Sequence, residues 1–516
     1  MSASVADIAA DLPLLPSKNR PLLLAAVMMV SMCQFFDATI ANVALPHMRA
    51  ALGASPESIS WVLTSFIITT AIATPITGWL SDRIGSRELF IGSTVLFLAS
   101  SAACGAATSL SAMVLFRAIQ GVAAAFIGPL TQIIMFDISP PSKQAATMSG
   151  FGMLVMVAPI SGPFIGAFLT DTLNWRWIYY VNLPIGIPAL VLLWWLLPSR
   201  PIERRRLDRF GFATLALALA ALQLLLDRGQ HNDWWESGET WIEALVMACA
   251  AWMFFVHTRT TSRPLFSPRL VSAPNFLVGC GSMAVLGISN VALSAILPTM
   301  YQTVFNFPVV YSGLLMAPRG FGVIAMTIVT NRLMRTIDHR FLISIGYLTV
   351  SGSVWIMTTW AMDMDWHRIV LASFVQGMGL GLVFTPMNML AFGSLPPDLR
   401  PDGASVLGLF RSIGGSIGIS VIVTQLANNQ QVSHAELAAH VTPMTDLAGA
   451  TGGMLPAEAA LPMLDGMIAK QAAMIAYLDD FKAIAVGMMV VALLPFLLKK
   501  PRRGEFDGVP HPAHGD

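Results

Sequence analysis

The stretch Phe35–Pro46, FFDATIANVALP, decides the fold, because it closes a long apolar segment that begins near Pro21 and carries one acid. Asp37 lies about sixteen residues into this segment, at a depth where little water reaches a helix that crosses a bilayer. A carboxylate at such a depth costs about 2.5–3.5 kcal/mol on insertion scales. Burial favours its neutral form, whereas a nearby cation favours its charged form. We therefore expect Asp37 to have a chemical role that involves a proton.

The composition indicates a protein that crosses a membrane many times. The chain has 516 residues, of which 55% are hydrophobic and 11% are charged, and its mean hydropathy is +0.67. Soluble domains are about 25% charged, so a polytopic membrane protein is favoured. The net charge of +1 argues against a nucleic-acid partner.

Cofactor chemistry finds little support in the sequence. The cysteines show no CxxC spacing and the histidines show no metal-ligand spacing within an apolar segment, so no metal site is expected. The G-x-x-x-x-G-K-[ST] phosphate-binding loop is missing from the sequence. No cluster of His, Cys or carboxylate residues suggests an enzyme. We therefore expect no cofactor and a proton gradient as the source of energy.

The apolar segments predict an all-α protein with fourteen transmembrane helices, arranged as two six-helix bundles with two inserted helices. Most Lys and Arg residues fall on the side of the two termini, which predicts that both termini are cytoplasmic. The predicted parts are a cytoplasmic segment 1–20, a first bundle 21–198, a linker with two extra helices 199–270, a second bundle 271–500 with an outer loop 428–480, and a cytoplasmic tail 501–516.

An internal repeat supports this division. Gly78–Arg87 and Asn331–Arg340 share a pattern at an offset of 253 residues, and Leu115–Gly121 matches Leu371–Gly377 at an offset of 256. Parallel repeats of this kind place the substrate site near the middle of the membrane, between the halves.

The loop from Gly78 to Arg87 carries a charged motif. Gly78 permits close helix approach, Gly85 permits a tight turn, and Asp82 can pair with basic neighbours such as Arg83. The alternative is an ordinary charged loop. The pattern resembles the G-x-L-x-D-R-x-G-x-R signature of the major facilitator superfamily, which implies a gate on the cytoplasmic side.

Arg117 lies inside an apolar segment and needs a partner or a wet cavity. Gln120 follows at i+3 and so shares its helix face. Asp37 is the acid at comparable depth in the first half, and we expect Asp37 and Arg117 to form the proton-coupling site. A purely structural or snorkelling arginine is the alternative.

A segment broken by glycine and proline contains Gly162, Pro163 and Gly166. It resembles the antiporter signature of the superfamily, which marks exporters. A generic pliable helix is the alternative reading, because small residues and prolines also permit close packing and bending.

Further stretches narrow the resemblance, namely Trp175–Gly186, Leu226–Trp234, Ala317–Gly320 and Leu409–Gly418. Together with Phe35–Pro46 they are similar to the fourteen-span drug:proton antiporters of the EmrB/QacA type, closer to EmrB. The resemblance implies a multi-pass protein of the cell inner membrane that passes substrate to a periplasmic adaptor and an outer-membrane channel.

The sequence thus predicts a proton-coupled antiporter that exports amphipathic or hydrophobic small molecules, of the multidrug type. An exporter of one specific metabolite or fatty acid, or an uptake symporter, is the alternative. The candidate residues of the substrate cavity are polar or charged side chains within predicted spans: Gln34, Asn42, Gln120, Arg319, Gln376, Asn388 and Arg411.

Overall fold

The computed structural model describes residues 12–199, 202, 206–229, 234–262, 264–393, 395–396, 399–441 and 457–497. The predicted tail 501–516 lies outside these residues, as do parts of the predicted segment 1–20, of the linker 199–270 and of the loop 428–480. The described residues form helices and no strand, so the prediction of an all-α membrane protein is confirmed.

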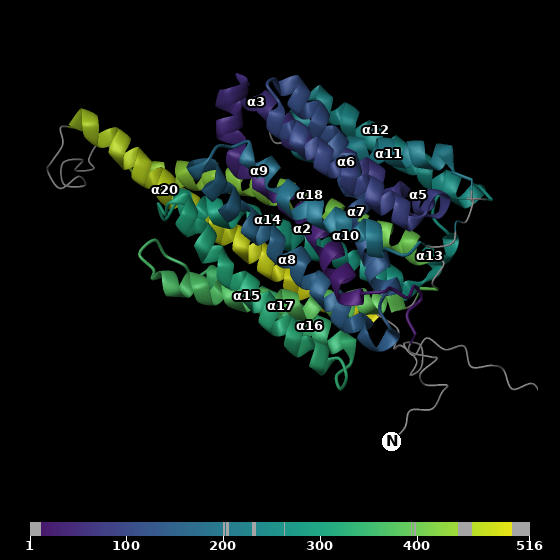
Figure 1. The fold of residues 1–516 in the computed structure, drawn as a ribbon. Helices are drawn as coiled ribbons and strands as arrows, with labels where there is room; N and C mark the ends of the chain where they lie inside the picture. The colour runs from purple at the N-terminus through teal and green to yellow at the C-terminus, as the bar shows by residue number, and fades with distance from the viewer. Residues whose placement is uncertain are drawn as a thin grey trace, which may run out of the picture.

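The first half of the chain forms a bundle of six helical segments (Figure 1). They are α2 (Arg20–Leu52), α4 (Trp61–Ala73) continued by η1 (Thr74–Ile76) and α5 (Thr77–Ile84), α6 (Ser86–Ala106), α7 (Leu110–Asp137), α8 (Pro141–Thr172) and α10 (Asn182–Leu196). The short helices α3 (Pro56–Ile59) and α9 (Trp177–Tyr180) lie in the connections.

The second half also contains six long helices, preceded by two inserted ones. The inserted helices are α11 (Arg209–Arg228) and α12 (Gly238–Thr260), with η2 (Trp234–Glu236) between them and α13 (Pro268–Ser272) after them. The bundle consists of α14 (Pro274–Thr303), α15 (Val309–Leu333), α16 (His339–Met357), α17 (Trp366–Gly393), α18 (Arg400–Ala438) and α20 (Ala457–Val491), which η4 (Leu494–Leu497) follows. Helix α11 packs on α4 and α18, and α12 packs mainly on α11.

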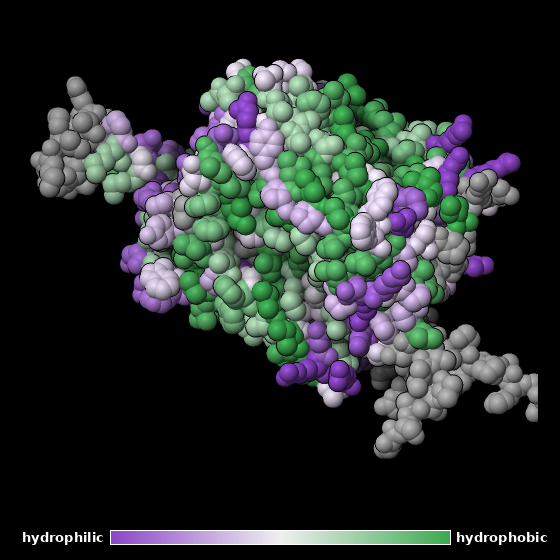
Figure 2. Space-filling model, viewed as in Figure 1, coloured by the Kyte–Doolittle hydropathy of each residue, from purple (hydrophilic) through white to green (hydrophobic). Residues whose placement is uncertain are grey.

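Twelve of the described helices are long and apolar enough to cross a membrane, and the bent pair Pro141–Pro159 and Ser161–Thr172 adds a thirteenth. Apolar side chains cover the flanks of the bundle, while hydrophilic ones gather toward its two ends (Figure 2). The fourteenth predicted span, 481–498, corresponds to the end of α20 with η4. Its passage through the bilayer stays a prediction.

The packing of the two halves repeats in detail. A Cβ atom built on Gly121 of α7 would lie 2.5 Å from the carbonyl oxygen of Phe66 on α4. One built on Gly377 of α17 would lie 2.0 Å from the carbonyl oxygen of Arg319 on α15. These contacts join corresponding positions of the two sequence repeats, and in both a glycine lets two helices meet backbone to backbone.

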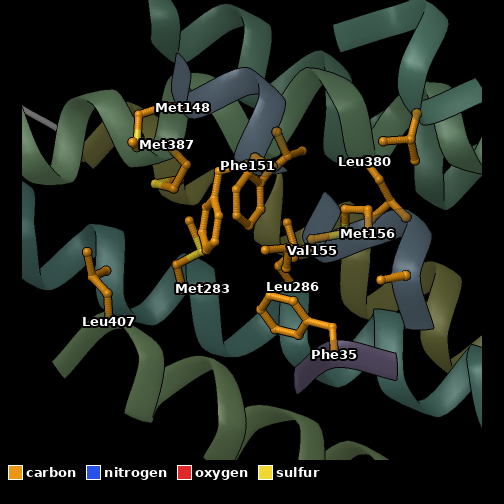
Figure 3. Packing of buried hydrophobic residues seen from close by; sticks show 14 of the residues in the cluster. Phe35, Met148, Phe151, Val155, Met156, Met283, Leu286, Leu380, Met387 and Leu407 are labelled. Carbon is orange, nitrogen blue, oxygen red and sulfur yellow. The ribbon is translucent and has the colours of Figure 1, made fainter. Parts of the chain in front are cut away.

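Apolar side chains fill the space between the halves (Figure 3). Phe35 of α2 lies 6.3 Å from Phe151 of α8 between ring centroids, and Phe151 lies 6.3 Å from Phe384 of α17. Met283 and Leu286 of α14 belong to the same buried cluster. The interface therefore combines aromatic rings with flexible methionine, a combination that can adapt to varied shapes.

We predict that Gly377→Ala destabilises the protein by about 1–3 kcal/mol, because the added methyl group meets the backbone of α15. Gly352→Ala in α16 is the matched control, since a Cβ there has no heavy atom within 4 Å. Alanine favours a helix over glycine by up to about 1 kcal/mol, so the control should be neutral or stabilising. Thermal unfolding in detergent measures both. Equal transitions would contradict the packing argument.

Candidate functional site: a buried ion pair in the first half

Asp37 and Arg117 form a buried ion pair between α2 and α7. The Asp37 side chain is 0% exposed and that of Arg117 is 1% exposed. Nη1 of Arg117 donates a hydrogen bond to Oδ2 of Asp37 over 2.5 Å. The depth of these two residues within their apolar segments predicts that they are partners. In the structure they are in direct contact.

The other carboxylate oxygen of Asp37 accepts two further hydrogen bonds. Nε2 of Gln120 donates to Oδ1 over 3.0 Å, and Nδ2 of Asn182 donates to the same atom over 3.2 Å. Asn182 is the first residue of α10, and it also donates to Oγ of Ser101 on α6 over 3.0 Å. Three donors from two helices thus hold the carboxylate, which compensates for its removal from water.

Arg117 is enclosed as completely as its partner. Its Nε donates to the carbonyl oxygen of Val62 on α4 over 3.1 Å, and its Nη1 also reaches Oε1 of Gln120 over 3.0 Å. The guanidinium carbon lies 4.2 Å from the ring centroid of Phe66 and 5.7 Å from that of Tyr179. Neutral acceptors and aromatic faces therefore remain for Arg117 if its bond to Asp37 opens.

The glycines of the antiporter-like segment hold α8 against the Asp37 helix. A Cβ on Gly162 would lie 2.2 Å from Oγ1 of Thr39, and one on Gly166 would lie 2.8 Å from Cγ1 of Ile40. Pro163 lies between them within α8. A shift of α2 near Asp37 therefore has to move α8 or open this contact.

Gln120 is a predicted residue of the substrate cavity, and in the structure its Nε2 donates to Asp37. Asn182 and Ser101 are not among the site residues predicted from the sequence. Their signal is weak, because a single Asn or Ser in an apolar helix often bonds to its own backbone. Only the fold shows that α6 and α10 bring them to the carboxylate.

The remaining uncharged candidates do not form one cluster. Gln34 is half-buried, and its Oε1 has no hydrogen-bond partner among the described residues. Asn42 is exposed, whereas Gln376 is fully buried with both amide atoms unpartnered in the described part of the chain. Asn388 is buried, and its Nδ2 donates to the Phe384 carbonyl oxygen of its own helix over 2.8 Å.

The two candidate arginines of the second half have different environments. Arg319 is fully buried and donates to Oδ1 of Asn290 over 2.6 Å and to Oγ of Ser294 over 3.0 Å. Arg411 on α18 is half-buried, and its guanidinium carbon lies 5.3 Å from the ring centroid of Phe35. Arg411 therefore reaches across the interface between the halves.

The motif at Gly78–Arg87 spans the end of α5 and the start of α6. Gly85 adopts φ +97°, a left-handed conformation that favours glycine. Nη2 of Arg87 donates to the Trp194 carbonyl oxygen over 2.7 Å, and the Arg83 guanidinium carbon lies 5.0 Å from the Trp79 ring centroid. Asp82 is half-buried within this turn.

Contacts between the halves gather at this end of the bundle. A Cβ on Gly78 would lie 2.2 Å from Oδ1 of Asp402 at the start of α18. Oγ of Ser149 donates to Oδ1 of Asn331 over 2.5 Å, again from one half to the other. The basic loops predict that this end is cytoplasmic. The two halves are therefore in contact at the predicted cytoplasmic end.

No group of three or more His, Cys, Asp or Glu side chains in the described part of the chain could hold a metal ion. Asp37, Arg117, Gln120 and Asn182 place an acid, a base and amide donors in a buried interior. Such a site can bind and release a proton when the bonds to the carboxylate change.

Comparisons with known proteins agree with this architecture. The multidrug export protein EmrB of Haemophilus influenzae is 33% identical over 82% of this chain and 83% of its own length. EmrB of Escherichia coli is 32% identical over 81% of this chain and 82% of its own length. The crystal structure of the human organic anion transporter MFSD10 superimposes with a TM-score of 0.59 at 14% identity, covering 93% of this chain and 99% of that one.

The family assignment follows from a match that covers most of the chain. Residues 27–419 match the family described as Major Facilitator Superfamily. This range includes the Asp37–Arg117 pair, the turn at Gly85 and the glycines of α8. The chain therefore belongs to the Major Facilitator Superfamily.

Proposed function

We propose that the chain is a proton-coupled antiporter that exports amphipathic or hydrophobic small molecules, of the multidrug type. The observation that carries the proposal is the buried Asp37–Arg117 pair, with its further donors Gln120 and Asn182. The similarity to proteins named multidrug export protein EmrB supports the class of substrate. The proton gradient supplies the energy, and no cofactor takes part.

In the proposed cycle a proton from outside neutralises Asp37 and weakens its bond to Arg117. Arg117 keeps the Val62 carbonyl oxygen, the Gln120 amide oxygen and the Phe66 ring as partners. The neutral acid no longer needs three donors, so α2 is free to change its position relative to α7 and α10. Release of the proton to the cytoplasm restores the pair.

The packing of α8 connects this change to the substrate path. Helix α8 contacts α2 through Gly162 and Gly166, and it contacts α15 of the other half near Phe164, where a Cβ on Gly313 would lie 3.0 Å from the Phe164 Cβ. A movement of α2 can thus reach the interface between the halves through the Ser161–Thr172 part of α8, which carries both contacts.

We predict that Asp37→Asn inserts, folds and binds substrate but does not drive export against a gradient. Asparagine resembles the protonated acid, so the site can no longer cycle between two charge states. Uptake of substrate into inverted vesicles under an imposed pH gradient measures the effect. Asp171→Asn, at an exposed carboxylate on α8, is the matched control. Normal uphill export by the Asp37 variant would remove the coupling site from this pair.

Arg117→Gln tests the same ion pair through its effect on the free energy of unfolding, which thermal unfolding in detergent measures. Arg117→Gln leaves Asp37 buried without its cation, and breaking such a pair destabilises proteins by about 3–5 kcal/mol when the charge remains. Adding Asp37→Asn to Arg117→Gln should recover part of the stability.

The proposed gate lies at the predicted cytoplasmic end. Asp82, Arg83 and Arg87, with the turn at Gly85, hold the halves together around Gly78 and Asp402 when the site faces outward. We predict that Asp82→Asn lowers the turnover of export about tenfold or more and leaves substrate binding within about threefold. Asp363→Asn in an exposed loop is the control. Loss of binding in a folded Asp82 variant would assign the loop another role.

We also propose that the protein works in the inner membrane, with both termini cytoplasmic, and passes substrate to a periplasmic adaptor and an outer-membrane channel. Helix α20 projects beyond the other helices (Figure 1). The outer ends of α18 and α20 meet where His434 Nε2 lies 3.0 Å from Asp465 Oδ1. Met463 and Met467 are 49% and 52% exposed on this hairpin, which offers an adaptor an apolar contact.

We predict that combining Met463→Asp with Met467→Asp abolishes drug resistance in cells that carry the adaptor, because charges replace the apolar contact. Transport by the purified variant in proteoliposomes should stay normal. Glu436→Gln, a polar change on the same hairpin, should leave both assays unchanged. Equal loss in cells and proteoliposomes would instead indicate a role in folding or gating.

A further inference from the structure

Arg411 occupies an unusual position for a cation. It lies on α18 one turn after Leu407, which is 3% exposed and belongs to the apolar cluster between the halves (Figure 3). Residues four apart share a helix face, so Arg411 faces the same space. Its guanidinium carbon lies 5.3 Å from the centroid of the Phe35 ring, which comes from the other half.

Arg411 makes no side-chain hydrogen bond or ion pair within the described part of the chain, and its guanidinium lies over the Phe35 ring. Asp402 is nine residues earlier on α18, about 13 Å along the axis at 1.5 Å per residue. Asp227 lies toward the other end, because the neighbouring Leu226 carbonyl oxygen accepts a hydrogen bond from Ser420, again nine residues away from Arg411. Thr64 donates a hydrogen bond to Asp227.

The acids of the second half make no ion pair with Arg411 in the described part of the chain, including Asp480 of α20, which is fully buried and whose carboxylate oxygens have no hydrogen-bond partner there. The sequences of α14, α15, α16 and α17 contain neither Asp nor Glu. Asp37, the deep acid of the first half, already accepts hydrogen bonds from Arg117, Gln120 and Asn182. A guanidinium at the middle of a membrane protein is normally paired or bound to neutral acceptors, as Arg319 is to Asn290 and Ser294.

The surroundings of Arg411 suit the rest of an amphipathic molecule. Phe35, Phe151, Met283 and Leu286 form the apolar wall between the halves (Figure 3). Guanidinium groups bind carboxylates through two parallel hydrogen bonds, and this geometry leaves the rest of the ligand directed away from the cation.

We propose that Arg411 binds the acidic group of the transported substrate, so that this site takes amphipathic organic anions with their apolar body against Phe35 and its neighbours. The proposal rests on the proposed function for the transport of these anions, but their binding does not require a proton gradient. The missing counter-charge of Arg411 is then supplied by the substrate.

Binding to the purified full-length protein in nanodiscs of zwitterionic lipid, at constant pH, tests the proposal. The probes are dansyl-undecanoate and its primary amide, which share an apolar body and differ in charge. The protein should bind the carboxylate at least about tenfold more tightly than the amide. Arg411→Gln should remove this preference, Arg411→Lys should keep part of it, and Arg368→Gln, at an exposed arginine, should leave it unchanged.

Two results would overturn the proposal. One is equal affinity of the unmodified protein for carboxylate and amide, a measurement that decides the question even if Arg411→Gln does not fold. The other is an equal loss of affinity for both probes in Arg411→Gln, which would make Arg411 a structural partner of Phe35. Asp37→Asn separates the two proposals, because it should lose proton-driven export and keep the preference for the carboxylate.

Discussion

The bond between Asp37 and Arg117 depends on nearly every helix of the first half. A carboxylate in an apolar interior is stable as a charge only when cations and N–H donors replace its water. Here Arg117 and Gln120 come from α7 and Asn182 from α10, while Ser101 of α6 and the Val62 carbonyl of α4 fix these partners in turn. A proton on Asp37 therefore acts on the whole bundle.

The two halves share a way of packing but not a charge pattern. Gly121 and Gly377 bring corresponding helices together. Gly121 faces the backbone of Phe66 in the first half, and Gly377 faces the backbone of Arg319 in the second. The counterpart of Arg117 in the repeat is Ser373, and no acid corresponds to Asp37. The first half thus holds a balanced pair, whereas Arg319 and Arg411 of the second half make no ion pair in the described part of the chain. On this difference rest our proposals that protons bind in the first half and anions at Arg411 in the second.

The sequence predicted much of this arrangement because charge is rare in apolar segments. Asp37 and Arg117 stand out by depth alone, and glycine and proline mark α8. Asn182 could not be found in this way, since a neutral amide adds little to hydropathy and its partner lies 145 residues away in the chain. The end of α2 was also missed. The apolar segment closes at Pro46, but α2 continues to Leu52, because packing can hold a helix together past a proline.

Electrostatics alone does not account for an exchange of protons and anions. A proton on Asp37 adds positive charge to the interior, and added positive charge attracts an anion to Arg411 instead of expelling it. Direct attraction would therefore favour transport of both ions in the same direction. Exchange requires that the two charge states of Asp37 prefer different arrangements of the halves, with Arg411 open to the anion in only one of them. The contacts of α8 with α2 at Gly162 and with α15 at Gly313 provide a route for that preference. In the proposed exchange the coupling accordingly resides in helix packing, and the charges select what is carried.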